Sequence, residues 1–451
     1  MNLLLIMADE HRRDAMGCAG HPVVRTPHLD ALAAGGVRYT SAYCTSPLCV
    51  PSRASFASGR YVHETGCWDN AAPYKGQPVS WGRLLKENGV DVTTIGKLDF
   101  DGTHDHGFDD ARFPAYRKEH SGGGAFDRHP PKPAARGKER LADSGTGSFW
   151  TERVERETSE AIYFLMNEVP HKSRPWVLWL NYLPPHFPLI APEPYSRLYP
   201  EEKVDMPFDL PAADRHPVVQ QMREYYNMTD LDESTVRRAR SAYYGLCTLI
   251  DDQVGRVMAA LEASGQADNT LIVYTSDHGD QLGDHELWWK GSMYETSVGV
   301  PLLVSGPAIE PGIVDDTPVS LVDLSATILD MFGIEAPSGW RGTSLLKLME
   351  QPDPERAVFS EYHAHGASTG LFMIRRGPLK LVHYEGFEPE LFHLEEDPQE
   401  LRSLSREPEW QTARTELEHA LAAIADTAAV DLAARSDQSL RREQREERKR
   451  Q

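Results

Sequence analysis

The chain has 451 residues, of which 40% are hydrophobic, and its formal net charge at pH 7 is -21. This length predicts one large domain with an appendage, or two to three ordinary domains. The negative charge argues against general nucleic-acid binding, and the lack of an apolar run of roughly 18 residues argues against a membrane span.

The N-terminal segment and the cysteines bear on the location of the protein. Residues 1–8 are apolar but lack the basic segment that begins a signal peptide, so we interpret them as a buried strand. The five cysteines are odd in number and too few for a disulfide scaffold. We therefore expect a cytoplasmic protein, with removal of a leader as the open alternative.

Short apolar runs alternate with helical patterns along the first 350 residues. In chain order, the expected strands are 3–7, 90–95, 176–180, 271–275 and 302–304. The expected helices are 29–34, 80–88, 151–169, 237–263 and 321–332. This alternation predicts an α/β fold with a large, mostly parallel sheet covered by helices on both faces.

The pattern changes near residue 351, which we take as the end of a catalytic domain over 1–350. A surface excursion is expected at about 118–150, where Gly, Pro, Arg and Lys are frequent. Residues 351–430 predict a smaller α+β subdomain, with short antiparallel strands at 358–362, 371–374 and 380–382 and a helix near 410–424. The charged tail at 431–451 predicts a solvated or frayed helix end.

Polar residues follow four of the expected strands, in chain order Asp9-Glu10, Lys97 with Asp99, His186, and Asp277-His278. Ligands of open α/β sheets bind beyond the carboxyl ends of the strands, so these groups should converge on one rim. Paired carboxylates offer the oxygen ligands that Ca²⁺ or Mg²⁺ prefers. Each pair alone is equally compatible with a solvated turn.

The run Cys49-Val50-Pro51-Ser52-Arg53, followed by Ala-Ser-Phe-Ala-Ser-Gly59-Arg60, is the most informative motif. It resembles the signature of the type I sulfatases of the alkaline-phosphatase-like superfamily. The resemblance implies that a formylglycine-generating enzyme oxidises Cys49 to Cα-formylglycine, whose hydrate is the nucleophile. Pro51 favours a helix start, which places residue 49 where partial positive charge stabilises an oxyanion. Without the modification, Cys49 is a buried thiol.

Other segments resemble the metal and sulfate motifs of that family. Ser-Asp277-His278-Gly-Asp is similar to its second metal motif. The resemblance implies a divalent cation, with Ca²⁺ expected and Mg²⁺ as the alternative, bound by Asp9, Glu10, Asp277, His278 and residue 49. The first metal pair of the family usually reads Asp-Asp or Asp-Gln, so Glu10 departs from the pattern.

The resemblance also assigns roles to residues around the nucleophile. Gly96-Lys97-Leu98-Asp99 resembles a Gly-Lys-x-His motif, which implies that Lys97 binds sulfate and that Asp99 replaces the histidine that deprotonates the sulfated hydrate. The same Asp form occurs in the branch that includes glucuronate-2-sulfatase. The resemblance further implies that His186 is the acid that protonates the leaving group. It also implies that Lys290 is a second sulfate-binding lysine and that Arg53 is a cation that reaches the hydrate.

Two segments bear on the substrate. Asp69-Asn70-Ala-Ala resembles a choline-sulfatase segment in which the asparagine touches sulfate. Ser360-Glu361-Tyr362-His363 resembles a motif of the glucuronate-2-sulfatase branch, so His363 and His365 are candidates to line the pocket, with an exposed strand end as the alternative.

The resemblance extends over most of residues 1–400 and implies a sulfuric ester hydrolase. The expected substrate is a small-molecule or oligosaccharide sulfate ester, with a sugar or uronate favoured by Asp99 and His363. Two other functions stay open: a phosphonate monoester or phosphodiester hydrolase with the same site, and a non-catalytic anion-binding relative with unmodified Cys49. Assembly as a homo-oligomer is also left open.

Overall fold

The computed structural model describes residues 1–119, 128, 137–211, 214–228 and 230–450. Much of the expected surface excursion at about 118–150 lies outside the described residues. No helix in the described ranges combines the length and the apolar character needed to cross a bilayer.

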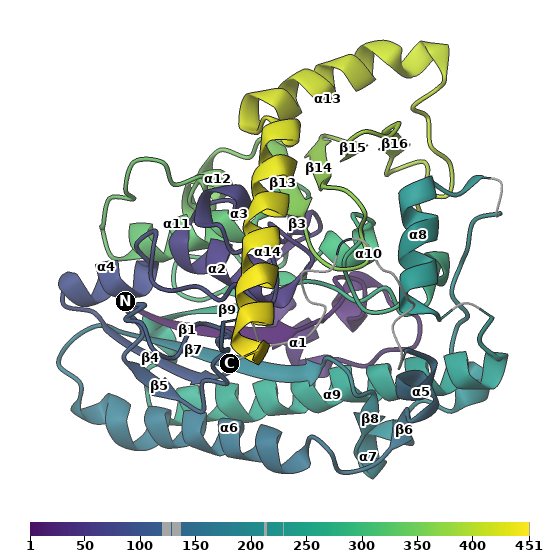
Figure 1. Cartoon of the computed structure of the whole chain (residues 1–451). Coiled ribbons are helices and arrows are strands. Elements are labelled where there is room, and N and C mark those ends of the chain that lie inside the picture. The colour runs from purple at the N-terminus through teal and green to yellow at the C-terminus, as the bar shows by residue number, and fades with distance from the viewer. Residues whose placement is uncertain (120–127, 129–136, 212–213, 229, 451) are drawn as a thin grey trace.

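An eight-stranded sheet forms the centre of the fold, with the strand order β11-β2-β10-β9-β1-β7-β4-β5 (Figure 1). Strands β9, β1, β7, β4 and β5 run parallel, and β10 is antiparallel to both β9 and β2. The prediction of a large, mostly parallel sheet is therefore confirmed. The strands of the chain are β1 (Asn2–Asp9), β2 (Gly36–Tyr39), β3 (Ala42–Tyr43), β4 (Asp91–Gly96), β5 (Asp110–Arg112), β6 (Gly145–Thr146), β7 (Trp176–Pro185), β8 (Ile190–Ala191), β9 (Thr270–Ser276), β10 (Leu302–Ser305), β11 (Ile313–Asp315), β12 (Val319–Ser320), β13 (Ala357–Tyr362), β14 (Leu371–Arg376), β15 (Leu379–Tyr384) and β16 (Glu390–His393).

Helices cover both faces of this sheet. Figure 1 shows α6 and α9 on one face and α2, α4 and α11 on the other. The helices are α1 (Pro27–Ala34), α2 (Cys49–Ser58), α3 (Val62–Thr65), α4 (Trp81–Glu87), α5 (Gly137–Ala142), α6 (Thr151–Tyr163), α7 (Glu193–Ser196), α8 (Pro217–Tyr226), α9 (Glu233–Ala263), α10 (Glu295–Val298), α11 (Leu321–Met331), α12 (Leu345–Glu350), α13 (Gln411–Ile424) and α14 (Thr427–Arg450).

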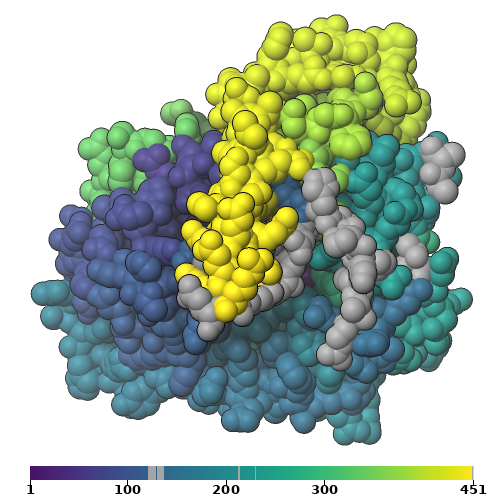
Figure 2. Space-filling model, viewed as in Figure 1, coloured from purple at the N-terminus to yellow at the C-terminus, as the bar shows by residue number. Residues whose placement is uncertain are grey.

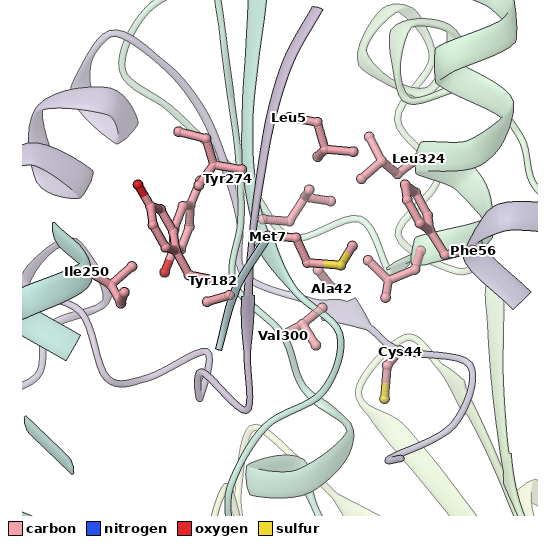
Figure 3. Packing of buried hydrophobic residues seen from close by; sticks show 14 of the residues in the cluster. Leu5, Met7, Ala42, Cys44, Phe56, Tyr182, Ile250, Tyr274, Val300 and Leu324 are labelled. Atoms are coloured by element: carbon pink, nitrogen blue, oxygen red, sulfur yellow. The ribbon is translucent and has the colours of Figure 1, made fainter. Parts of the chain in front are cut away.

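The two-sided cover explains why the central strands are apolar without alternation. All eight residues of β1 are buried. Leu5 and Met7 point toward Phe56 of α2 and Leu324 of α11, whereas Tyr274 of β9 lies on the opposite side of the sheet, beside α9 (Figure 3). A strand that is buried on both faces has no polar face, so it appears as a continuous apolar run in the sequence.

A second sheet, β13-β14-β15-β16, is antiparallel and carries α13 against it. Its core joins residues from both, with Phe359, Phe372 and Leu417 among its members. The antiparallel subdomain predicted for the C-terminal part is therefore present, and β16 is a strand that the sequence reading did not include.

The C-terminal residues form the 24-residue helix α14, which lies along the surface of the large α/β part (Figures 1 and 2). This differs from the expected solvated end, because Gln438 and Arg441 are buried. Arg441 donates to both oxygens of Asp69, at 3.0 and 2.7 Å, and Gln438 Nε2 donates to Asp69 Oδ2 at 3.0 Å. The ion pair satisfies the charges that burial would otherwise penalise.

Two buried histidines should make the fold sensitive to acid. His216 Nδ1 accepts a hydrogen bond from Val218 N at the start of α8, Nε2 donates to Glu388 O, and the ring stacks on Tyr384 at 3.8 Å. His285 stacks on Tyr294 at 4.0 Å. Burial lowers the pKa of each histidine from 6.5 to about 4.

Since both pKa values are lower in the folded than in the unfolded chain, the stabilisation is complete above pH 6.5 and is lost as the pH falls toward 4. We expect each histidine to contribute roughly 2 kcal/mol to this loss. Urea midpoints measured between pH 7 and pH 5 will test the expectation. His216→Phe keeps the stack but cannot titrate, so it should have a shallower pH dependence than the wild type and than the exposed control His171→Gln. Equal slopes for all three proteins would contradict the assignment.

Candidate active site

Four neighbouring strands bring the candidate residues to one edge of the sheet. Asp9 ends β1, Lys97 follows β4, His186 follows β7 and Asp277 follows β9. Because β4, β7, β1 and β9 are adjacent and parallel, their carboxyl ends lie side by side. The polar groups that the sequence places after four separate strands are thus neighbours in space.

Cys49 is the first residue of α2 and is fully buried. The amide of Ser52 donates to Leu48 O and closes the first turn of the helix, whose N-terminus carries partial positive charge. The Cys49 Sγ atom lies 3.3 Å from His278 Nε2 and 3.7 Å from Asp9 Oδ1. Position 49 therefore faces the candidate metal ligands.

Cys49 differs electrostatically from the other cysteines. Burial raises the pKa of the remaining four thiols, Cys18, Cys44, Cys67 and Cys247. Burial and Asp9 oppose ionisation of Cys49 as well, yet Lys290, Lys97 and His278 outweigh them and hold its pKa well below the usual value. The site thus stabilises negative charge at position 49, which an anionic nucleophile requires.

The candidate metal ligands form a tight group. One ligand atom from each of Asp9, Cys49, Asp277 and His278 lies within 4.8 Å of the others. Glu10 belongs to an adjoining group with Asp9 and His186, and its Oε1 atom is buried without a hydrogen-bond partner among the described residues. Three carboxylates, one of them with an unsatisfied oxygen, fit a hard divalent cation. The two groups share Asp9, so they adjoin each other at that carboxylate.

Arg53 connects the candidate metal ligands to the neighbouring strands. It is fully buried, and its Nε donates to Asp277 Oδ2 at 2.7 Å. Its Nη1 donates to Lys97 O at 2.7 Å and to Asn181 Oδ1 at 2.8 Å. These bonds hold the guanidinium beside the acidic ligands, where it offsets part of their charge.

Lys97 and Lys290 pair with different carboxylates of the site. Lys97 Nζ contacts Asp9 and lies 3.1 Å from Asp99, and Lys290 Nζ lies 2.9 Å from Glu10 Oε2. The position of Lys97 depends on Gly96, which has a φ of 87° and whose Cβ, if present, would lie 1.9 Å from Asn181 O. Only glycine permits this approach of β4 to β7.

His186 presents one particular ring nitrogen to the site. Nδ1 pairs with Phe187 O at 2.6 Å, which assigns the proton to Nδ1 and leaves Nε2 facing inward, 3.4 Å from Glu10 Oε2. Burial and Lys290 lower the pKa of His186 despite the nearby Asp9. The protonated ring is therefore a stronger acid than an exposed histidine.

Asp99 has a partner that no sequence motif marks. Arg117 donates from Nη2 to Asp99 Oδ2 at 3.1 Å, and its Nε lies 2.9 Å from Asp99 Oδ1. The two-point contact fixes the orientation of the carboxylate. Arg117 lies at the edge of a segment with many charged residues, so its role was not visible in the sequence.

Three residues in and beside this site have a strained backbone. Glu10, Asp99 and Trp289 have positive φ angles of 69°, 61° and 65°. Such conformations are unfavourable for residues with a Cβ and often mark functional positions. Asp280 supports the last of them, because its Oδ1 accepts hydrogen bonds from the amides of Leu282 and Trp289.

The two candidate substrate residues occupy different places. Asn70 Oδ1 accepts a hydrogen bond from Val50 N at 3.1 Å, so Asn70 adjoins the start of α2, where Cys49 lies. His363 is buried, which excludes the exposed strand end, and its Nε2 pairs with Glu361 Oε2 at 2.9 Å. Its carbonyl accepts from Gln438 of α14. His363 thus sits in the layer that connects α14 to the segment carrying Asn70.

Two family models match overlapping parts of the chain. The family model described as "Sulfatase" matches residues 1–334, and the model "N-sulphoglucosamine sulphohydrolase, C-terminal" matches residues 283–427. The choline-sulfatase of Rhizobium meliloti (strain 1021) is 32% identical over 465 residues, which cover 98% of this chain and 90% of that protein. Arylsulfatase K of Danio rerio is 31% identical over 437 residues, covering 90% of this chain and 80% of that protein.

A solved structure has the same fold. It is that of BT4656 in complex with its substrate D-glucosamine-2-N,6-O-disulfate, with a TM-score of 0.75 and 24% sequence identity. The superposition covers 93% of this chain and 96% of that one.

Proposed function

The chain belongs to the sulfatase family and is an enzyme that hydrolyses sulfate esters, and we propose that it acts on a sugar or uronate sulfate through a formylglycine hydrate at position 49. The position of Cys49 carries this proposal. Its sulfur lies at a helix N-terminus, 3.3 Å from His278 and 3.7 Å from Asp9. Two lysines, Lys97 and Lys290, lower the pKa of this thiol. The same positive charges would stabilise an oxyanion nucleophile at position 49.

We assign one step of the reaction to each residue. One hydroxyl of the hydrate first loses its proton to solvent. The resulting oxyanion attacks sulfur while the bond from sulfur to the ester oxygen breaks, and Lys97 and Lys290 hold the sulfate oxygens. His186 Nε2 gives its proton to the departing alkoxide. Asp99, oriented by Arg117, then takes the proton of the second hydroxyl. The carbonyl re-forms as the carbon–oxygen bond to sulfate breaks, and water hydrates the aldehyde again.

Asp9, Glu10, Asp277 and His278 would hold the divalent cation. When bound, the ion stabilises negative charge on the nucleophile and on the sulfate oxygens. The oxygen-rich ligand set favours Ca²⁺, with Mg²⁺ as the alternative. Conversion of Cys49 by a formylglycine-generating enzyme and a cytoplasmic location complete the proposal, the latter from the odd number of unpaired cysteines.

A direct comparison of rates tests the proposed reaction. We expect kcat/KM for 4-nitrophenyl sulfate to exceed that for 4-nitrophenyl phenylphosphonate by at least about tenfold, equivalent to ~1.4 kcal/mol of transition-state stabilisation. Mass spectrometry of the peptide with residue 49 must accompany the assay, to show that the aldehyde is present. The reverse rate order would identify a phosphonate monoester hydrolase. A retained thiol after co-expression with the maturation enzyme would identify a non-catalytic relative.

A further inference from the structure

One arginine near the leaving-group side of the site is held by aromatic rings. The guanidinium carbon of Arg140, on α5, lies 5.1 Å from the centre of the Phe187 ring and 5.5 Å from that of Trp289. The two rings lie 4.8 Å apart, and Phe187 in turn stacks on His186 at 4.1 Å. Arg140 is therefore one ring away from the residue that protonates the leaving group.

Arg140 is exposed and has no ion pair or hydrogen bond within the part of the chain that the structure describes. This is unusual in a chain with a net charge of -21, where other arginines near α5, such as Arg238 and Arg240, bond to oxygens of the protein. Stacking occupies the faces of a guanidinium and leaves its N–H groups at the edge free. Those donors suit a carboxylate or a sulfate, which bind arginine through two parallel hydrogen bonds.

A second cation, Lys290, lies near the Phe187 ring. Lys290 Nζ lies 5.5 Å from the centre of the Phe187 ring, so Lys290 and Arg140 are at most about 11 Å apart. One molecule can therefore place its reacting sulfate at Lys290 and a second anionic group at Arg140. The indole N–H of Trp289 is also buried without a partner among the described residues, which provides another donor beside this path.

We propose that Arg140 is a specificity residue that binds an anionic group, a carboxylate or a second sulfate, on the alcohol part of the substrate. The inference rests on the proposed function and narrows its substrate to acidic sugars. A neutral alcohol would leave the guanidinium without a counter-charge. A cationic alcohol would instead have to displace Arg140 from the two rings. In that case, removing Arg140 should favour the cationic substrate.

The test uses substrates that differ only in charge, with the full-length protein carrying the aldehyde at residue 49. We expect Arg140→Met to lower kcat/KM for a methyl glucuronoside sulfate by roughly 10- to 100-fold, mainly through KM, and to change that for the corresponding methyl glucoside sulfate less than threefold. Arg140→Lys should restore part of the loss. The matched control is Arg156→Met, since Arg156 also stacks on an aromatic ring, Phe113 at 4.4 Å, but on α6.

Three outcomes separate the hypotheses. Equal loss on both sugar sulfates, or no loss, overturns the role of Arg140, while continued hydrolysis of 4-nitrophenyl sulfate leaves the sulfatase proposal intact. A gain on choline sulfate in Arg140→Met would also overturn it, by showing that the rings receive a cation. If the modified wild-type protein fails to hydrolyse any of these esters, the proposed function itself fails.

Discussion

Replacing Cys49 with alanine should lower kcat for aryl sulfates by about 10⁴-fold or more, because it removes the side chain from which the proposed nucleophile is made. The remaining lysines and metal ligands would still bind sulfate. We therefore expect KM to change much less than kcat. Steady-state kinetics with 4-nitrophenyl sulfate gives both values, and circular dichroism checks that the variant folds.

A buried cysteine outside the site provides the control. Cys247, on α9, is also fully buried, but burial raises the pKa of its thiol instead of lowering it. Cys247→Ala should keep kcat within a factor of about three, although it creates a small cavity that costs some stability. Residual activity above about 1% in Cys49→Ala would contradict the proposed nucleophile.

Serine at position 49 separates the two halves of the reaction. A serine hydroxyl can attack sulfur, but it lacks the second hydroxyl from which a carbonyl re-forms, so it cannot expel sulfate by that route. We expect Cys49→Ser to accumulate a sulfated peptide without turnover, detectable by mass spectrometry. Steady turnover by this variant would mean that sulfate leaves by another path.

The sequence was informative where local patterns determine structure. Apolar runs marked β1, β4, β7 and β9 because each is covered on both faces, and the polar residues after them marked the rim. The order of the strands, with β1 between β9 and β7, depends on contacts between distant segments and was not visible. Adjacency of Asp9 and Asp277 follows from that order.

The local sequence carries little information about charged residues whose partners are distant in the chain. Arg441 lies in a stretch that resembles a solvated helix, yet it pairs with Asp69, 372 residues away. Arg117 lies at the edge of the Gly-, Pro- and Arg-rich region and Arg140 lies within it, and nothing in the local pattern there separates a site residue from a surface residue. Burial of a charge depends on a counter-charge supplied by the fold, and sequence spacing carries no signal for it.

His186→Ala should have an effect that depends on the alcohol released. Sugar alkoxides are poor leaving groups and need a proton as the bond to sulfur breaks, so we expect kcat/KM for a sugar sulfate to fall by about 10²- to 10⁴-fold. Nitrophenolate leaves readily without a proton, and the loss on 4-nitrophenyl sulfate should stay below about tenfold. The measurement is kcat/KM for a series of aryl sulfates whose phenols differ in pKa. We expect kcat/KM to fall more steeply with increasing phenol pKa in the variant than in the wild type.

His186→Gln distinguishes proton transfer from hydrogen bonding. Its amide N–H can donate toward the same oxygen as Nε2, but it cannot release a proton. If His186 acts as an acid, Gln and Ala should lose similar activity on sugar sulfates. If Gln instead restores the rate, His186 only orients the ester. Equal losses on aryl and sugar esters would show that the residue acts through Glu10, 3.4 Å from its Nε2, and that the leaving group receives its proton elsewhere.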